Sequence, residues 1–322
     1  NDVNGFMVLL VRRGMLMELH GVTQSIGSKS LMQIPRIMRR LIMVLITLAC
    51  GLGCADIATA EDAAVELISF PDYSPYISED LPGGGMYTEL IRAAYAREGV
   101  TLEVRNLHWK RAYRLVQAGE AVGTYSWFQT AERERLFILS RAIFSDTPEI
   151  FTTLPDVKTV TQLRALLRQG KNAAVCVPLG WTVAPVFQAL IEAKQLARVA
   201  PANIGACFNL LNSGLVQLIS ISRLAASFEV KAFRRRSGAG ADALSNLHLV
   251  TPEKQSIFTA RILFARTDKG AEAAATFGRG FDALIADGTY QLIVKKHLDF
   301  YPDIDQKQVF TELKALGLIA DE

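Results

Sequence analysis

Hydrophobic residues follow two alternating spacings over residues 64–128. Short runs of apolar or alternating residues, which are typical of strands, are separated by longer stretches whose apolar residues recur at helical spacing. The predicted strands are 65–70, 101–104 and 122–128, and the predicted helices are 86–98 and 109–118. This order predicts a mostly parallel sheet with covering helices.

The same rhythm begins again at residue 160 and ends with two helices. The expected elements are helix 160–167, strand 172–177, helix 182–194, helix 206–212, strand 215–221, strand 258–265, and helices 271–286 and 289–297. A similar order of strands and helices thus occurs twice, and a further strand and two helices follow. This arrangement predicts that the second lobe is inserted into the first, which the last elements of the chain complete. We expect a first lobe of residues 61–152 plus 257–322 and a second lobe of residues 153–256, with crossing strands near 150–153 and 252–257.

Residues 38–60 have the pattern of a cleaved signal peptide. A basic pair precedes an apolar core at residues 41–52, and Ala58-Thr59-Ala60 is a small-x-small cleavage site. An uncleaved membrane anchor is the alternative, but the core is shorter than the about 20 apolar residues that a membrane span needs. We therefore expect export to the periplasm and cleavage after Ala60.

Two further features of the first 60 residues bear on this prediction. Residues 1–37 show no cap or sustained period, and we interpret them as a segment that is not native or is disordered. A lipoprotein is not expected, because neither Cys50 nor Cys54 has a leucine three places before it.

The excess of positive charge also belongs to this part of the chain. The first 60 residues contain six of the 35 lysines and arginines and three of the 32 aspartates and glutamates, so the remainder carries 29 of each. A net charge of zero gives no support to binding of nucleic acid or of a membrane surface.

No pattern for metal, cofactor or catalytic chemistry stands out. Gly83-Gly84-Gly85 lacks the Lys-Ser/Thr end of a phosphate-binding loop, and the sequence has no C-x-x-C or His-Cys cluster. It also has no G-x-S-x-G, H-E-x-x-H or Ser/His/Asp spacing. We therefore expect no metal, no cofactor and no enzymatic activity.

Cys176 and Cys207 are the cysteines that remain after the expected cleavage. Two cysteines in an exported chain favour one disulfide. Closing a loop of about 30 residues would stabilise the fold by about 3–4 kcal/mol in the chain-entropy model. Two buried free thiols are the alternative.

The segment from Ser126 to Ser140 reads S-W-F-Q-T-A-E-R-E-R-L-F-I-L-S and contains a T-x-E-R turn that ends at Arg133. With the W-K-R step at 109–111 and the ending D-G-T-Y-Q-L-I-V-K-K-H at 287–297, it resembles the family 3 extracellular solute-binding proteins, the polar amino-acid receptors of ABC importers. The W-K-R step is similar to that of a proteobacterial subgroup.

The resemblance covers residues 64–300 and implies the fold. The expected class is the α/β type II periplasmic-binding-protein fold. It has two lobes, each with a mixed or mostly parallel sheet and flanking helices, and two hinge crossings join them.

The resemblance also implies the ligand-binding residues of the first lobe. The guanidinium of Arg133 would hold a ligand carboxylate, to which it offers two charge-assisted hydrogen bonds. Ligands of open α/β sheets bind beyond the ends of the strands, so residues at strand ends are also candidates. The resemblance adds the family's aromatic platform and the start of the second predicted helix. These further candidates are Tyr73, Tyr76, Trp109, Arg111, Tyr125 and Trp127. For Tyr73, Tyr76 and Trp109, a place in the core is the alternative.

In the second lobe the resemblance implies a binding turn at Gly180, Trp181 and Thr182, where backbone N–H groups can bind an anion. The family's G-R-V-D-x-x-x-x-D segment reads G-L-V-Q-L-I-S-I-S-R here. Gln217 and Ser222 therefore replace two aspartates, the second of which binds the ligand's ammonium group in the family. An unpaired ammonium in a closed cleft costs several kcal/mol. We therefore expect a small anion, a dicarboxylate, or an aromatic or other uncharged ligand rather than an ordinary α-amino acid.

The expected function is that of a monomeric periplasmic solute-binding protein. It would close on a small polar or anionic ligand and deliver it to the membrane subunits of an ABC importer. One alternative is an enzyme on the same fold, similar to cyclohexadienyl dehydratases, for which Glu120 or Glu132 would supply a cleft carboxylate. A second alternative is a module that senses a ligand for a partner protein. The basic segment 234–240 is predicted to be a surface loop, with a docking site as the alternative.

Overall fold

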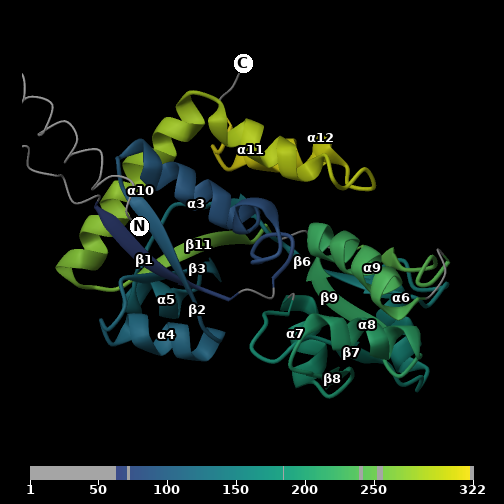
Figure 1. Ribbon diagram of the computed structural model, residues 1–322. Helices are drawn as coiled ribbons and strands as arrows, with labels where there is room; N and C mark the ends of the chain where they lie inside the picture. The colour runs from purple at the N-terminus through teal and green to yellow at the C-terminus, as the bar shows by residue number, and fades with distance from the viewer. Residues whose placement is uncertain (1–62, 71–72, 184, 239–241, 252–256, 320–322) are drawn as a thin grey trace, which may run out of the picture. The chain divides into compact units, whose positions relative to one another are not determined.

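The computed structural model describes residues 63–70, 73–183, 185–238, 242–251 and 257–319. Residues 61–322 form one compact unit (Figure 1). The predicted signal peptide at 38–60 and the segment before it lie outside the described residues. No helix in the described ranges is both long enough and apolar enough to cross a membrane.

The first sheet is mixed and has the order β2-β1-β3-β11-β4, with β5 also paired to β11. Its parallel part joins β1 to β2 and β3, and its antiparallel part joins β11 to β3, β4 and β5. The bounds are β1 (Ala64–Ser69), β2 (Thr101–Asn106), β3 (Gly123–Phe128), β4 (Ile138–Leu139), β5 (Phe144–Ser145) and β11 (Thr259–Phe264). The chain thus leaves this sheet after β5 and returns to it at β11.

Helices cover this sheet and include the C-terminal part of the chain. They are η2 (Pro82–Gly84), α3 (Met86–Arg97), α4 (Trp109–Gln117), α5 (Ala131–Leu136), α10 (Asp268–Ala286), α11 (Thr289–Leu298) and α12 (Gln306–Ala315). Figure 1 shows α3 and α10 side by side over the sheet. A side chain at Gly280 would meet the Ala94 carbonyl oxygen at 1.9 Å, so this glycine permits the close packing of the two helices. The buried rings of Tyr95, Phe277 and Phe281 fill the space beside it.

The second sheet is also mixed and has the order β10-β6-β9-β7-β8. Its strands are β6 (Pro148–Thr152), β7 (Ala174–Cys176), β8 (Ala197–Val199), β9 (Leu218–Ser222) and β10 (His248–Leu249), and its helices are α6 (Val160–Arg168), α7 (Pro185–Glu192), α8 (Ile204–Asn212) and α9 (Arg223–Ser237). Residues 148–152, which the sequence analysis assigns to the first lobe, pair with β9 in this sheet. The two sheets with their helices confirm the predicted two-lobe α/β fold.

The predicted disulfide between Cys176 and Cys207 is confirmed. It joins the end of β7 to α8, and both cysteines are fully buried. The covalent bond therefore ties a central strand of the second sheet to a covering helix.

The prediction of a loop at residues 234–240 was wrong for its first part, because Arg234–Ser237 continue α9. The buried Leu224, Ala225 and Phe233 recur at helical spacing and hold the helix on its sheet. The helix ends at Gly238, which has φ 62° and can adopt this left-handed conformation at no steric cost. The sequence analysis also missed the preceding part of α9 and the whole of α12, which contacts the core through the buried Leu313.

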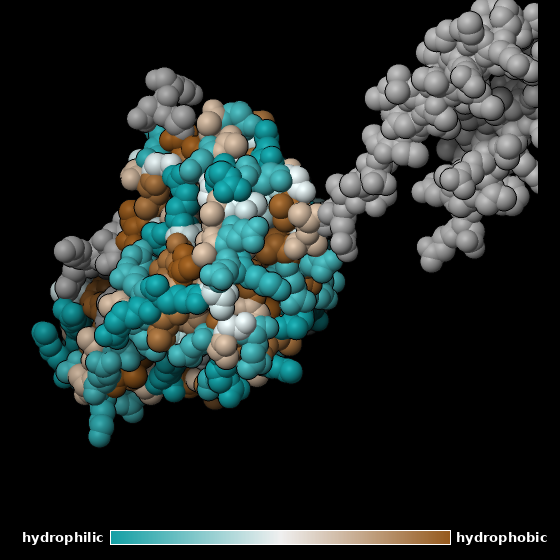
Figure 2. All heavy atoms as spheres, turned by 90° about the vertical axis from the view of Figure 1, so that its left-hand side faces the viewer, coloured by the Kyte–Doolittle hydropathy of each residue, from teal (hydrophilic) through white to brown (hydrophobic). Residues whose placement is uncertain are grey.

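The surface that Figure 2 shows is mostly hydrophilic, with small hydrophobic patches separated by polar side chains. The described residues on this face thus leave no single continuous apolar surface exposed.

Candidate ligand-binding site

One cleft is lined by residues of both sheets and has a volume of about 60 Å³. The first-lobe residues follow β1, begin α4, end β3 and begin α5, and the second-lobe residues begin β6, follow β7 and end β9. The described residues that line it are Tyr73, Trp109, Ser126, Trp127, Phe128, Arg133, Pro148, Gly180, Trp181, Thr182, Ser220, Ile221 and Ser222. Strand ends supply much of this lining, as expected for a ligand site in an α/β fold.

Arg133 is held in the cleft by the short helix α5. The Thr130 side chain caps this helix by accepting a hydrogen bond from the Arg133 backbone N–H, at 3.2 Å. The Arg133 Nη1 donates to the Phe128 carbonyl oxygen at 2.5 Å, and its Cζ lies 4.8 Å from the centre of the Trp127 ring. These contacts fix the guanidinium beside the aromatic wall of the cleft.

The charge of Arg133 is not neutralised by a neighbour. Among the described residues, no carboxylate lies within salt-bridge distance of its guanidinium. Burial lowers the pKa of Arg133, although the field of Tyr113 and Glu132 opposes this effect. Neither of these two residues lines the cleft. The guanidinium thus carries an uncompensated positive charge into a partly buried site, which favours an anion beside it.

Aromatic side chains form most of the remaining walls. The Tyr73 and Trp181 rings, which come from different lobes, meet edge to face with centroids 4.9 Å apart. The Trp109 and Trp127 rings meet in the same way at 5.1 Å. These pairs place flat apolar surfaces on both sides of the cleft.

Three of the predicted site residues do not line the cleft. Tyr76 is buried behind Tyr73, and its hydroxyl lies 3.0 Å from the Ser222 Oγ. Tyr125 is fully buried, with its hydroxyl 2.9 Å from the Thr88 Oγ1. Arg111 is exposed on α4. Strand and helix positions were predicted correctly here, but the direction of each side chain depends on packing.

The alternative acids Glu120 and Glu132 are both exposed and also lie outside the lining. Among the described residues, no group of three or more His, Cys, Asp or Glu side chains is arranged to hold a metal ion.

Asp146 is a buried acid that the sequence analysis missed. It lies between β5 and β6, is 1% exposed, and its Oδ2 accepts a hydrogen bond from the Tyr73 hydroxyl at 2.7 Å. Burial raises the pKa of Asp146 to about 6, and hydrogen bonds from Tyr73 and its neighbours only partly oppose this. A single aspartate between Ser145 and Thr147 gives no signal of this role in the sequence. Asp146 therefore stands behind the cleft and holds Tyr73 in place.

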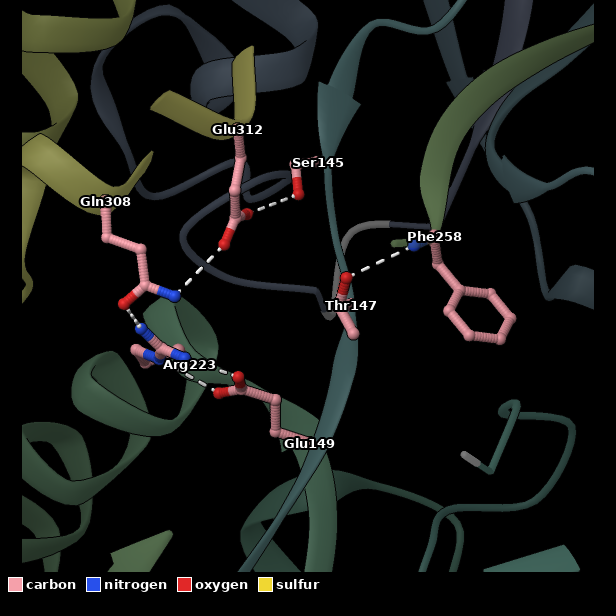
Figure 3. Close-up of polar contacts among 7 residues, drawn as sticks. All are labelled: Ser145, Thr147, Glu149, Arg223, Phe258, Gln308 and Glu312. Carbon is pink, nitrogen blue, oxygen red and sulfur yellow. Dashed lines mark hydrogen bonds and ion pairs between the residues drawn. The ribbon is translucent and has the colours of Figure 1, made fainter. Parts of the chain in front are cut away.

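Arg223 follows the cleft residue Ser222 but is engaged elsewhere (Figure 3). Its Nε and Nη2 donate to the Glu149 carboxylate at 3.0 and 2.5 Å, and its Nη1 donates to the Gln308 Oε1 at 2.6 Å. Gln308 in turn donates to Glu312, which accepts from the Ser145 hydroxyl. Arg223 is thus not available to the cleft, and Arg133 is the one charged side chain in the described lining.

Figure 3 also shows where the two crossing segments meet. The Phe258 backbone N–H donates to the Thr147 Oγ1 at 3.2 Å, and the Asp146 backbone N–H donates to the Phe258 carbonyl oxygen at 2.9 Å. Asp146, which accepts the Tyr73 hydroxyl, is therefore hydrogen-bonded through its backbone to the segment that crosses between the sheets.

Solved structures similar to this chain share its fold at low sequence identity. A histidine kinase sensor domain with similarity to periplasmic binding proteins is 20% identical, with a TM-score of 0.57 over 73% of this chain and 96% of that one. An ancestral arginine-binding protein bound to arginine is 18% identical, with a TM-score of 0.57 over 73% and 97%. An amino acid ABC transporter substrate-binding protein from Streptococcus pneumoniae, bound to L-arginine, is 18% identical, with a TM-score of 0.55 over 74% and 94%.

A search of curated proteins found no match. The family model of the bacterial extracellular solute-binding proteins, family 3, matches residues 67–300. The matched range includes the second sheet, the first sheet except for the start of β1, and all of the described cleft residues. This chain therefore belongs to the family 3 bacterial extracellular solute-binding proteins.

Proposed function

We propose that this protein is the periplasmic solute-binding component of an ABC importer, a monomer of the proteobacterial subgroup that is exported by cleavage of residues 38–60. It takes up a small polar or anionic ligand between the lobes 61–152 plus 257–322 and 153–256, and delivers it to the membrane subunits without chemical change. The observation that carries the proposal is Arg133, a partly buried guanidinium without a carboxylate partner in an aromatic cleft.

The energetics of Arg133 support an anionic group on the ligand. A charge that is moved out of water costs free energy unless a partner compensates it. A ligand carboxylate would supply that partner, with the planar fork of the guanidinium setting its orientation. The turn at Gly180, Trp181 and Thr182 would close over the ligand from the second lobe.

The small volume of the cleft supports a function that involves opening. About 60 Å³ is well below the roughly 300–1,000 Å³ of pockets that hold drug-sized ligands. The Tyr73 and Trp181 rings occupy the space between the lobes, so a ligand of moderate size enters only when these rings separate. Movement of the lobes about the crossing segments at Thr147 and Phe258 would provide the separation.

Titration with a metabolite extract of the source cells tests the proposal. Fractions of the extract should raise the melting temperature of the exported protein, and native mass spectrometry should show a small molecule bound to it. Arg133→Ala should weaken this binding by about 2–5 kcal/mol, because truncating one partner of a buried charged hydrogen bond costs this much. Arg135→Ala is the matched control, since Arg135 lies on the same helix and is exposed. Equal binding by both variants, or no stabilising fraction, would contradict the proposal.

Asp146 favours an enzyme on the same fold as a second candidate function. A carboxyl group with a pKa of about 6 can donate a proton near neutral pH. Asp146 does not line the cleft, so the proton would pass to a ligand through the hydroxyl of the cleft residue Tyr73, to which Asp146 is hydrogen-bonded. Incubation with a cyclohexadienyl carboxylate, followed by detection of the aromatic product, tests this function. Turnover that is lost in Asp146→Asn would support it, and absence of turnover would leave binding as the function.

A further inference from the structure

We infer that the ligand is an aromatic carboxylate that carries no α-ammonium group and bears a hydrogen-bonding oxygen at a distance from its carboxylate. This inference rests on the proposed function and names the ligand class for the same cleft. Three properties of the lining carry it: its charge, its aromatic surface, and a set of polar atoms that have no partner.

The charge of the lining selects against a zwitterion. Arg133 is a cation, and the other twelve lining residues that the structure describes are uncharged. The buried acid Asp146 lies outside the lining; its Oδ2 accepts from the Tyr73 hydroxyl, and its Oδ1 is buried without a partner. Glu149 lies beyond the cleft as well and is paired with Arg223 (Figure 3). The α-ammonium of an amino acid would therefore lose its hydration without gaining a carboxylate.

The aromatic surface selects for a flat, apolar body. Five of the thirteen lining residues are aromatic, and they come from both lobes: Tyr73, Trp109, Trp127, Phe128 and Trp181. Aromatic rings pair with one another by offset stacking or by edge-to-face contact. A ligand ring that enters between Tyr73 and Trp181 would replace their mutual contact with two new contacts of the same kind.

Unpartnered polar atoms point to a second polar group on the ligand. The Trp109 Nε1, the Ser126 Oγ and the Ser220 Oγ are buried and make no hydrogen bond, and all three residues line the cleft. Buried polar atoms without a partner are uncommon, because each has lost its hydrogen bonds to water without replacing them. Ser220 is 1% exposed, so its hydroxyl gains a partner only from something inside the cleft. A ligand hydroxyl, which can both donate and accept, would satisfy it.

The backbone at Ser126 places its hydroxyl in the cleft. Ser126 has φ 71°, a left-handed conformation that is costly for a residue other than glycine. Glycine would remove this cost but would also remove the hydroxyl. Ser126 is the extra residue of a bulge in the pairing of β3 with β11, which accounts for its backbone. The bulge leaves its buried Oγ in the lining of the cleft, where a ligand can bind it.

Two matched pairs of probes test the inference. Hydrocinnamate is phenylalanine without its ammonium group, and phloretate is tyrosine without its ammonium group. Calorimetric titration of the exported protein with all four compounds should show that each acid binds at least about 100-fold more tightly than its amino acid, the effect of an unpaired ammonium worth a few kcal/mol. Phloretate should bind more tightly than hydrocinnamate because of its ring hydroxyl.

Two variants assign these effects to the cleft. Arg133→Ala should weaken binding of both acids at least about 30-fold, whereas the exposed Arg135→Ala should not. The double variant Ser126→Ala/Ser220→Ala should remove the preference for phloretate, so that its affinity falls to that of hydrocinnamate for the same variant. Far-UV circular dichroism and the melting temperature of each variant verify that it is folded.

The outcomes separate this inference from the proposed function. Binding of phenylalanine or tyrosine as tight as that of its matched acid would overturn the inference. Absence of binding by all four probes would overturn it too. In either case an Arg133-dependent ligand in the metabolite extract would leave the proposed function standing. A preference for phloretate that survives in the double variant would overturn the assignment of the hydroxyl contact.

Discussion

At the residue scale, Asp146 shows how one buried group makes stability depend on pH. Burial raises its pKa to about 6 from an ordinary value of 3.8. Between these values the folded protein holds a proton that the unfolded chain has lost. The contribution of this group to the free energy of unfolding therefore falls as the pH rises from about 4 to about 6, and it stays low above that window.

Asp146→Asn should abolish this dependence. Asparagine keeps an oxygen that accepts the Tyr73 hydroxyl but cannot ionise, so the variant avoids the cost of a buried charge. Urea unfolding at about pH 8 should show it to be about 3 kcal/mol more stable than the parent, since one pKa unit corresponds to about 1.4 kcal/mol. The difference should nearly vanish at about pH 4. The exposed Asp156→Asn serves as control, and a variant that is less stable than the parent at about pH 8 would contradict the prediction.

At the scale of elements, the face of α9 at Arg223, Ser227 and Lys231 is bound by the C-terminal segment. These residues are spaced by four and therefore share one side of the helix. Gln308 accepts from Arg223, and Asp303 accepts from both Ser227 and Lys231. The segment that contains α12 thus joins the end of the chain to the second lobe.

The ion pair between Arg223 and Glu149 should matter most in this interface. The Glu149 side chain is 11% exposed, so Arg223→Met leaves a mostly buried carboxylate without its partner. We expect the free energy of unfolding, measured with a chemical denaturant, to fall by about 2–3 kcal/mol. The reason is that the carboxylate left behind stays buried without a compensating charge. Lys231→Met is the contrasting variant. Both partners of its ion pair with Asp303 are more than 40% exposed, and its loss should stay below about 1 kcal/mol.

A double variant distinguishes a broken ion pair from a lost side chain. Arg223→Met combined with Glu149→Met removes both charges and should recover much of the stability lost in Arg223→Met alone. If the double variant were less stable than Arg223→Met, the broken ion pair would not be the cause of the stability lost in Arg223→Met.

At the scale of the whole molecule, the three tryptophans of the chain all line the cleft. Tryptophan emission therefore reports on this one region of the protein. We expect a ligand that separates Tyr73 from Trp181 to change the wavelength of maximum emission, and Trp181→Phe to reduce that change. Titration with phloretate measures it. A calorimetric binding signal without any change in emission would show that the ligand binds outside the cleft.

The alternation of strand and helix patterns was sufficient to predict the two-lobe fold. Apolar spacing is a local property, and it located β1, α3, β3, α6 and α11 to within a few residues. The helices α9 and α12 were missed because polar and basic residues interrupt their apolar spacing. The disulfide followed from counting cysteines, which also requires no tertiary information.

Sequence alone thus determined the class of fold, the family resemblance, the disulfide, and Arg133 as a residue with a chemical reason to meet an anion. Only the tertiary structure decided which side chains surround that arginine, because the direction of a side chain depends on its packing against distant elements. Packing buried Tyr76 and Tyr125 and exposed Arg111. It also placed Asp146 behind Tyr73, more than 70 residues away in the chain, and left the hydroxyls of Ser126 and Ser220 without partners in the cleft.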